Sequence, residues 1–191
     1  MKELVFLLEE PSAQDMLTGL LPRLLPDDVC YRCIPFQGKQ DLEKQLARKI
    51  RGYQNPKARF IVMRDLDNHS DCRVLKAQLL EKCRESGKAD VTLVRLACRE
   101  LESFYLADLA AVEAGLKING VLKHQQSRKF RTPDALGSPS SELKQLTKGI
   151  YQKRSGSRAI GAHLDPNNTR SDSFRNLVSA IKKQSQALAA Y

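Results

Sequence analysis

Acidic residues stand at or just beyond the ends of three short apolar segments of the chain. Glu9 follows "LVFLL", Asp65 and Asp67 follow "FIVMR", and Glu100 and Glu102 come a few residues after "VTLVRLA". Alternate residues of an extended chain point the same way, so Asp65 and Asp67 are expected to face one place together. Glu100 and Glu102 would likewise point in one direction together if the chain at these residues is extended and not yet helical. Carboxylate oxygens are the ligands that Mg²⁺ and Mn²⁺ prefer, and the pattern therefore favours a divalent-metal site.

These carboxylates also have ordinary structural uses. Asp67 and Asp71 could cap the helix that follows them, and Glu9 could pair with an arginine. Several carboxylates gathered at one place repel one another, and burying them unpaired is costly, so a bound cation would resolve that repulsion. Spacing alone leaves both interpretations open.

Basic residues are concentrated in the second part of the chain. The net charge is +10, of which residues 1–110 carry +1 and residues 111–191 carry +9. A basic surface suits a polyanion such as nucleic acid, although it could also serve only solubility. The residues expected to contact phosphates are Arg64, Arg99, Lys153, Arg154, Arg158, Arg170, Ser171, Ser173 and Arg175. Ser171 or Ser173 could instead be the N-cap of the last helix.

The elements that must position these residues alternate between strand and helix. Short continuous apolar runs predict strands over residues 3–9, 29–36, 58–63 and 90–97, and helices follow over 15–25, 39–53, 70–87 and 99–116. Runs of this kind, rather than in-and-out alternation, are typical of a parallel sheet covered on both faces. In such a sheet, ligands bind beyond the carboxyl ends of the strands, where the acidic residues fall.

The second part of the chain is expected to be more irregular. We predict loops over residues 117–140 and 154–173, a short helix over 141–153 and a closing helix over 173–188. The predicted organisation is an α/β core over residues 1–115 with a basic, mostly helical extension over residues 116–191 packed on it.

Cysteine usage and the absence of a targeting signal indicate a cytoplasmic protein. Five cysteines, an odd number, argue against a disulfide framework. Cys30 and Cys33 have the spacing of zinc and redox sites, but no second pair accompanies them, so they are expected to be ordinary half-buried thiols. The longest apolar run, "LVFLL", is too short to span a membrane, and no secretory cleavage site follows it.

A strand ending in Glu and another ending in Asp-x-Asp resemble the Toprim arrangement of topoisomerases, primases and overcoming-lysogenization-defect nucleases. More closely, the chain resembles the bacterial family catalogued as domain of unknown function 4276, considered Toprim-like. The matching segments span nearly the whole chain: "LLEEPSAQDML", "IPFQGKQDLEKQL", "RDLDNHSDCRVLKAQL", "ACRELESFYLADLAAVE", "YQKRSGSRAIGAHLD" and "RSDSF".

The resemblance implies roles for individual residues. It places a metal-binding or acid/base carboxylate on Glu9 and metal aspartates on Asp65 and Asp67. Glu100 and Glu102 match the closer family and are expected to complete the site, with Glu100 as a further metal ligand. Toprim domains usually carry Gly after the first Glu, which allows a tight turn, but Glu10 stands there, so the turn and the chemistry are both in question.

Together these features favour one hypothesis for the function and leave an alternative open. The favoured hypothesis is a nuclease for DNA or RNA that depends on Mg²⁺ or Mn²⁺, acting in defence against phage beside an ATPase of the ABC or structural-maintenance type. No G-x-x-x-x-G-K-[ST] loop occurs, so that ATPase would be a separate protein. The alternative is a non-catalytic Toprim-like module that docks on the ATPase. An enzyme acting on nucleotides is a weaker third possibility.

Overall fold

The protein is an α/β structure built on one parallel sheet, as predicted. The computed structural model describes residues 1–190. The strands are β1 (Lys2–Leu8), β2 (Val29–Pro35), β3 (Ala58–Asp65) and β4 (Thr92–Ala97), in the order β2-β1-β3-β4. All neighbouring strands run parallel, so their carboxyl ends lie at one edge of the sheet. That edge carries the acidic residues.

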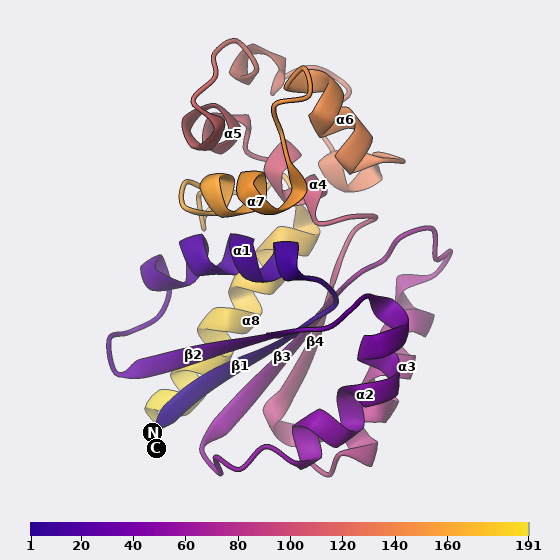
Figure 1. Cartoon of the computed structure of the whole chain (residues 1–191), viewed down its shortest axis with the longest axis vertical. Helices are drawn as coiled ribbons and strands as arrows, with labels where there is room; N and C mark the ends of the chain where they lie inside the picture. Colours follow the sequence, from indigo (N-terminus) through magenta and orange to yellow (C-terminus); the bar gives the residue numbers. More distant parts are fainter. Residues whose placement is uncertain (191) are drawn as a thin grey trace.

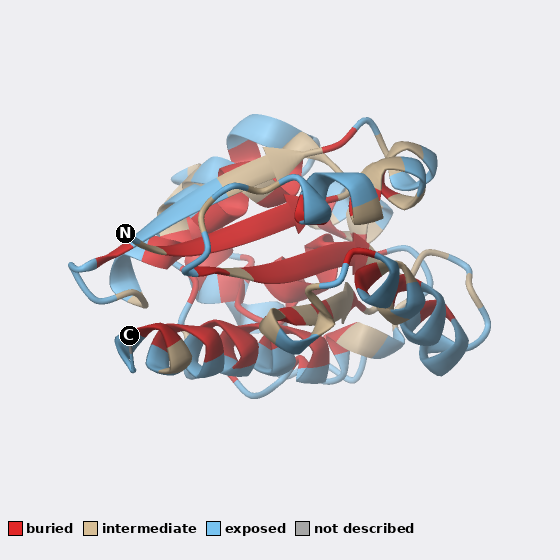
Figure 2. Ribbon diagram, turned by 90° about the horizontal axis from the view of Figure 1, so that it is seen from below, coloured by how far each residue is buried: buried red, intermediate tan, exposed pale blue. Residues whose placement is uncertain are grey.

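Helices cover both faces of the sheet (Figure 1). On one face, α2 (Lys39–Arg51) and α3 (Cys72–Glu85) pack against Val5, Leu7 and their neighbours on β3 and β4. On the other face, α1 (Pro11–Leu20) and α8 (Asp172–Ala189) pack against Leu4, Phe6 and Leu8. Figure 2 shows the central strands buried between these two layers. Burial on both faces explains why the strands read as continuous apolar runs.

Four further helices lie beyond α1, on the side away from the sheet (Figure 1). They are α4 (Glu102–Leu106), α5 (Leu109–Leu116), α6 (Pro139–Leu146) and α7 (Lys153–Gly161). Within residues 1–190, short 3₁₀ turns occur at Leu21–Arg23, Ala89–Val91, Leu122–His124 and Pro133–Ala135. The predicted loop over 154–173 was wrong in its first half, because α7 occupies it. The Ser- and Gly-rich sequence has low helix propensity, but burial of Ile160 stabilises the helix.

Helix α7 packs unusually close to its neighbours because glycines face the contacts. A Cβ atom on Gly161 would lie 2.3 Å from the Met16 carbonyl oxygen of α1, and one on Gly19 would lie 2.4 Å from the Ala162 nitrogen. Arg23 then donates hydrogen bonds to the carbonyl oxygens of Leu164, at 2.7 Å, and Gly161, at 2.8 Å. These contacts hold the end of α7 against the second half of α1, while the Lys153–Glu10 ion pair joins the starts of the two helices.

The last helix joins the two predicted parts of the chain. Phe174, Leu177 and Ile181 of α8 belong to the same apolar cluster as strands β1 and β3, and the Gln184 amide nitrogen donates to the Phe60 carbonyl oxygen at 3.1 Å. The division into a core over 1–115 and an extension over 116–191 stays a prediction, with α8 of the second part lying on the sheet. Among residues 1–190, no helix combines the length and the apolar character that crossing a bilayer requires.

Candidate metal centre at the carboxyl edge of the sheet

Glu9 follows the last residue of β1 and ties the ends of two strands together. Its backbone nitrogen donates to the Met63 carbonyl oxygen at 3.1 Å, and its carboxylate accepts from the Asp65 backbone nitrogen at 3.1 Å. The Arg64 Nε lies 3.8 Å from the same carboxylate. Burial raises the pKa of Glu9 and the charge of Asp67 adds to the rise, while the bond from Asp65 and the charge of Arg64 oppose it.

The turn after Glu9 does not need the glycine that Toprim domains usually carry. Glu10 is extended, with φ of −146° and ψ of 160°, and Pro11 directly begins α1. A proline at the first helical position is favourable because its fixed φ suits the helix and its missing N–H is not required. The sequence departure at Glu10 therefore changes how the turn is built without straining the backbone.

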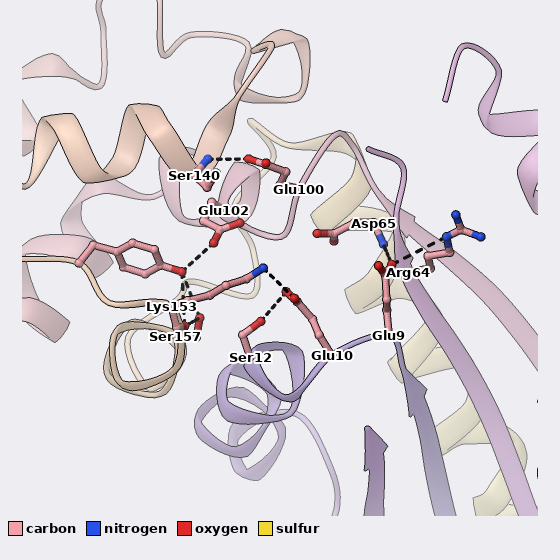
Figure 3. A network of polar contacts seen from close by, with 11 residues as sticks. Glu9, Glu10, Ser12, Arg64, Asp65, Glu100, Glu102, Ser140, Lys153 and Ser157 are labelled. Atoms are coloured by element: carbon pink, nitrogen blue, oxygen red, sulfur yellow. Dashed lines mark hydrogen bonds and ion pairs between the residues drawn. The ribbon is translucent and has the colours of Figure 1, made fainter. Parts of the chain in front are cut away.

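The carboxyl edge of the sheet, with its acidic residues, is called the acidic edge below. Asp65 is the last residue of β3, and its side chain points toward the other carboxylates of this edge (Figure 3). The pKa of its carboxyl group is raised well above the ordinary value, first by burial and then by the negative charges of Glu10, Glu9 and Glu102. The Leu101 backbone N–H opposes this rise. The carboxylates of Glu9 and Glu10 after β1, Asp65 at the end of β3 and Glu102 at the start of α4 thus form one cluster of negative charge. The sequence predicted such a cluster at the strand ends.

Asp67 does not face the same place as Asp65, and that expectation was wrong. Strand β3 ends at Asp65, and Asp67 has a left-handed φ of 51°, so the extended geometry that would align the two side chains is lost. Its carboxylate accepts a hydrogen bond from the Lys39 ammonium at 3.0 Å. Asp67 remains close enough to Glu9 for its charge to raise the pKa of that group. The helix cap predicted for this segment is Asp71, which accepts from the Arg73 backbone nitrogen at 2.7 Å.

Glu10 and Lys153 form an ion pair across the edge (Figure 3). The Lys153 ammonium donates to one Glu10 oxygen at 2.7 Å, and the Ser12 hydroxyl donates to the other at 2.6 Å. Burial lowers the pKa of Lys153, but the bond to Glu10 and the charges of Glu10, Glu102 and Asp65 outweigh burial and raise it. Lys153 therefore stays an ammonium ion at neutral pH and partly balances the carboxylates around it.

Glu100 and Glu102 diverge, because the chain turns into α4 between them. Glu100 accepts from the Ser140 backbone nitrogen at 2.7 Å, within the first turn of α6. Glu102 is 1% exposed, and one of its oxygens accepts from the Tyr151 hydroxyl at 2.9 Å. The other oxygen, Oε2, is buried with no hydrogen-bond partner among the described residues. Burial raises the pKa of Glu102.

The Tyr151 hydroxyl should matter most when Glu102 is charged. Tyr151→Phe is expected to lower the free energy of unfolding at pH 7 by about 1–3 kcal/mol, because a buried carboxylate loses its donor. The loss should shrink in a Glu102→Gln background, where no charge is buried. Denaturant titration of the two single variants and the double variant measures this coupling. Equal losses in both backgrounds would contradict it, and Tyr31→Phe, at an exposed tyrosine of β2, is the matched control.

The carboxylates of this edge fit a hard divalent cation by their chemistry. They are oxygen donors with raised pKa values, and the orphaned Glu102 Oε2 is a buried acceptor that a cation or its bound water would satisfy. As the side chains stand in residues 1–190, no three His, Cys, Asp or Glu residues form a ready-made ligand cluster. Internal bonds from Lys153 and Ser140 hold two of the carboxylates. Metal binding would therefore require side chains to exchange these partners for the ion.

The predicted basic residues of α7 lie beside this edge. Arg154 donates to one oxygen of the buried Asp15 carboxylate at 2.7 Å, and Arg158 donates to the other at 2.8 Å. Burial acts to raise the pKa of Asp15, but the bonds from the two guanidinium groups hold it below its ordinary range. The Arg154 and Arg158 side chains remain 66% and 67% exposed, so both still present charge to solvent.

The other predicted phosphate contacts are scattered. Arg64 is buried between Glu9 and Glu43, and Arg99 donates to the Asp67 carbonyl oxygen at 3.3 Å. Arg170 and Arg175 are exposed, on the segment before α8 and on α8 itself. These four arginines belong to other elements than Arg154, which lies on α7.

Ser171 and Ser173 are structural residues. Ser171 is fully buried and is the N-cap of α8, accepting from the Phe174 backbone nitrogen at 3.0 Å. Its hydroxyl donates to the Asp134 carboxylate at 2.7 Å, and the Ser173 backbone nitrogen donates to the same carboxylate at 2.9 Å. We therefore leave both serines out of any nucleic-acid surface.

The remaining candidates from the sequence have ordinary surroundings. Cys30 and Cys33 both lie on β2, and burial raises the pKa of the Cys33 thiol to about 12, so that thiol is protonated at neutral pH. The site residues that sequence reasoning missed are Tyr151 and Ser140, which contact acidic residues 49 and 40 positions away along the chain. No local pattern indicates such contacts.

Comparison with known proteins supports the fold described above. The solved C-terminal region of the Burkholderia pseudomallei OLD protein is similar in structure, with a TM-score of 0.54 and 16% identity over 96% of this chain and 98% of that one. At this identity the likeness concerns the fold, which is α/β and Toprim-like. No curated protein matches the sequence. The family described as "Domain of unknown function (DUF4276)" matches residues 8–182, and the chain therefore belongs to that family.

Proposed function

We propose that the protein is a nuclease that requires a divalent metal ion and hydrolyses phosphodiester bonds of DNA or RNA at the carboxyl edge of its sheet. The observation that carries the proposal is Asp65, a carboxylate at the end of a central strand that faces three other carboxylates. Two cations stand among these acids in the contacts of residues 1–190: Lys153, which pairs with Glu10, and Arg64, whose Nε lies 3.8 Å from Glu9, and neither forms an ion pair with Asp65. Such an arrangement is unfavourable by itself and becomes favourable when it binds a cation.

In this proposal, Glu9 and Asp65 hold Mg²⁺ or Mn²⁺, and Asp67, Glu100 and Glu102 complete the surroundings. The ion, when bound, activates water and stabilises the charge that develops on the phosphate. Glu9 is fixed for this role by its bond to the Asp65 backbone nitrogen.

Basic residues of α7 would hold the nucleic-acid backbone beside the carboxylates. Arg154 and Arg158 are oriented by Asp15 and remain exposed, and the Lys153 ammonium lies within the acidic edge itself. These residues bind phosphates without reading sequence. Arg170 and Arg175 would make more distant contacts.

We further propose that the domain acts with a separate ATPase in defence against phage. Support comes from the resemblance to Toprim-like proteins that work beside such ATPases. The solved structural neighbour is also one region of a longer protein, so a fold of this kind occurs joined to other parts. Co-purification with the ATPase encoded nearest to this protein tests the partnership, and failure to find a complex would contradict it.

The nuclease proposal predicts cleavage that depends on Mn²⁺ or Mg²⁺ and on Glu9. We expect purified protein to cleave at least one member of a panel of single- and double-stranded DNA and RNA oligonucleotides, alone or with its ATPase. Glu9→Gln should reduce the rate about 100-fold or more, because its carboxylate is lost without a change in shape. The control is Asp27→Asn, at an exposed carboxylate before β2, at the opposite end of the sheet. Equal activity of Glu9→Gln and wild type would contradict the proposal.

The second candidate is a non-catalytic module that docks on the ATPase. The observation that favours it is the Lys153–Glu10 ion pair, which already supplies a positive charge inside the acidic edge. The two candidates differ in the effect of Asp65→Ala on protection of cells against phage. A nuclease loses protection while its complex with the ATPase still assembles, whereas a docking module keeps both.

A further inference from the structure

A cavity of about 330 Å³ lies along the outer strand of the sheet, apart from the acidic edge. Strand β4 is an end strand, with β3 on one side only. The walls come from β4, from the start of α3 and from the start of α8, which belong to the opposite layers of the protein. The lining residues are Leu66, Cys72, Arg73, Lys76, Val94, Arg95, Leu96, Cys98, Asp172, Ser173 and Asn176.

Three basic residues line this cavity without acidic partners. Within residues 1–190, Arg73, Lys76 and Arg95 form no ion pair with a carboxylate. The single acid of the lining, Asp172, accepts a hydrogen bond from Arg175 at 2.7 Å. The cavity is therefore electropositive, in contrast to the acidic edge.

Arg95 is held in a fixed orientation toward the cavity. Its Nε donates to the Asn176 carbonyl oxygen at 2.9 Å, and another guanidinium nitrogen donates to the Val94 carbonyl oxygen at 2.8 Å. Burial lowers the pKa of this arginine, which means that its charge is partly removed from water. A partly desolvated cation with only neutral partners is stabilised by a bound anion.

Part of the lining is apolar and suits the apolar part of a ligand. Leu66, Val94 and Leu96 provide one wall, along β4 and at the residue that follows β3. A volume of about 330 Å³ stands at the lower end of the range for small-molecule sites, which run from roughly 300 to 1,000 Å³. The cavity therefore suits one phosphate with one ring system rather than a dinucleotide.

We propose that this cavity binds a nucleoside 5′-monophosphate unit, with the phosphate held by Arg73, Lys76 and Arg95 and the base against Leu66, Val94 and Leu96. The unit could be a free nucleotide or the 5′-terminal nucleotide of a strand, because both present the same phosphate and ring. This inference does not rest on nuclease activity. It concerns a different set of side chains from those of the acidic edge.

Protection of a cysteine measures occupancy at the proposed place. Cys72 is exposed and lines the cavity, whereas Cys30 is exposed on β2, at the far edge of the sheet. Alkylation of the full chain by a maleimide, followed by peptide mass spectrometry, reports both thiols at once. We expect nucleoside monophosphates to slow labelling of Cys72 at least 5-fold at saturation and to leave Cys30 unchanged.

Calorimetry in roughly 0.15 M salt then measures affinity and its dependence on the basic residues. Lys76→Gln is expected to weaken binding about 10-fold, because one charge-assisted bond to phosphate is lost. Lys44→Gln, at an exposed lysine of α2, is the control that changes net charge equally and should not alter binding. Inorganic phosphate should bind at least 10-fold more weakly than a nucleoside monophosphate, since it lacks the ring.

The source of the unit is decided by comparing two probes. If free monophosphates protect Cys72, the ligand is a nucleotide, and if only 5′-phosphorylated oligonucleotides do so, it is a strand terminus. Either result supports the site when Lys76→Gln shifts protection to about 10-fold higher probe concentration. The proposal is overturned if neither probe protects Cys72, if protection of Lys76→Gln needs no higher probe concentration than protection of wild type, or if an acidic peptide alone protects Cys72.

Discussion

Asp65→Asn should abolish metal-dependent cleavage and at the same time make the metal-free protein more stable. The two effects have one cause. Burial and the charges of Glu10, Glu9 and Glu102 all disfavour an ionised Asp65 in the folded protein, and the same ionised group is the proposed metal ligand. A charged functional side chain can lower the free energy of unfolding, and replacing it with a neutral side chain then raises that free energy.

The sign of the pH dependence follows from the raised pKa. Between the ordinary value of 3.8 and the higher pKa in the folded protein, the folded state holds a proton on Asp65 that the unfolded state has released. Stability therefore falls as pH rises through this window, and the unfavourable contribution is complete above the folded-state pKa. Asp65→Asn removes that contribution, so the stability of the variant relative to wild type should increase as pH rises above the ordinary value of 3.8 and through the folded-state pKa of Asp65.

The expected sizes are large enough to measure. At pH 7 without metal, the free energy of unfolding should increase by about 0.5–2 kcal/mol, which is about 2–4 °C in Tm for each kcal/mol. Saturating Mn²⁺ should raise the Tm of wild type and leave the variant unchanged. Cleavage should fall about 1,000-fold, equal to about 4 kcal/mol of transition-state stabilisation. Loss of stability in metal-free Asp65→Asn, with Asp27→Asn unaffected, would contradict the description of this edge.

Gly161→Ala should destabilise the whole protein, although alanine is the better helix former. A Cβ atom at this position would lie 2.3 Å from the Met16 carbonyl oxygen, which belongs to the backbone of α1 and cannot turn aside. Forcing the two helices apart costs typically about 1–3 kcal/mol and outweighs the gain in helix propensity of about 1 kcal/mol. We expect a loss of several degrees in Tm by circular dichroism.

The same substitution should also disturb the acidic edge. Helix α7 begins with Lys153, so moving it away from α1 weakens the Lys153–Glu10 ion pair and the Arg154–Asp15 bond. The control is Gly137→Ala, at a glycine with nothing within 4 Å of the added Cβ atom, which should change stability by less than about 0.5 kcal/mol. A Gly161→Ala variant as stable as Gly137→Ala would show that the helices are not packed as described.

The sheet and its covering helices could be predicted from the sequence because their signals are local. Apolar runs of strand length alternate with helices whose buried residues recur three or four positions apart, as Leu42, Leu46 and Ile50 do in α2. Helix α7 could not be predicted in this way. Its Ser- and Gly-rich sequence resembles a loop. Its Gly161 faces the backbone of α1 and its Gly156 faces the Tyr151 ring, and only the tertiary structure reveals these close contacts.

The sequence predicted those positions of site residues that follow from the order of the strands. It did not predict the contacts that depend on local backbone conformation and on side chains distant in the sequence. Glu9 and Asp65 come together because β1 and β3 are parallel neighbours with matched ends. Asp67 turns away because its own backbone is in the left-handed conformation. No sequence pattern indicated this, since aspartate adopts that conformation only occasionally. The partners of Glu102 and Glu100 come from the second part of the chain, across long loops.

The most direct test of the central claim is calorimetric titration of Mn²⁺ into the full chain, with and without an oligonucleotide made uncleavable by phosphorothioate linkages. Wild type is compared with Asp65→Asn and with the Asp27→Asn control. The nuclease proposal predicts heat of binding for wild type and Asp27→Asn, strengthened by the oligonucleotide, and none for Asp65→Asn. Binding that survives in Asp65→Asn, or no binding to any of the three proteins even with the oligonucleotide present, would contradict it.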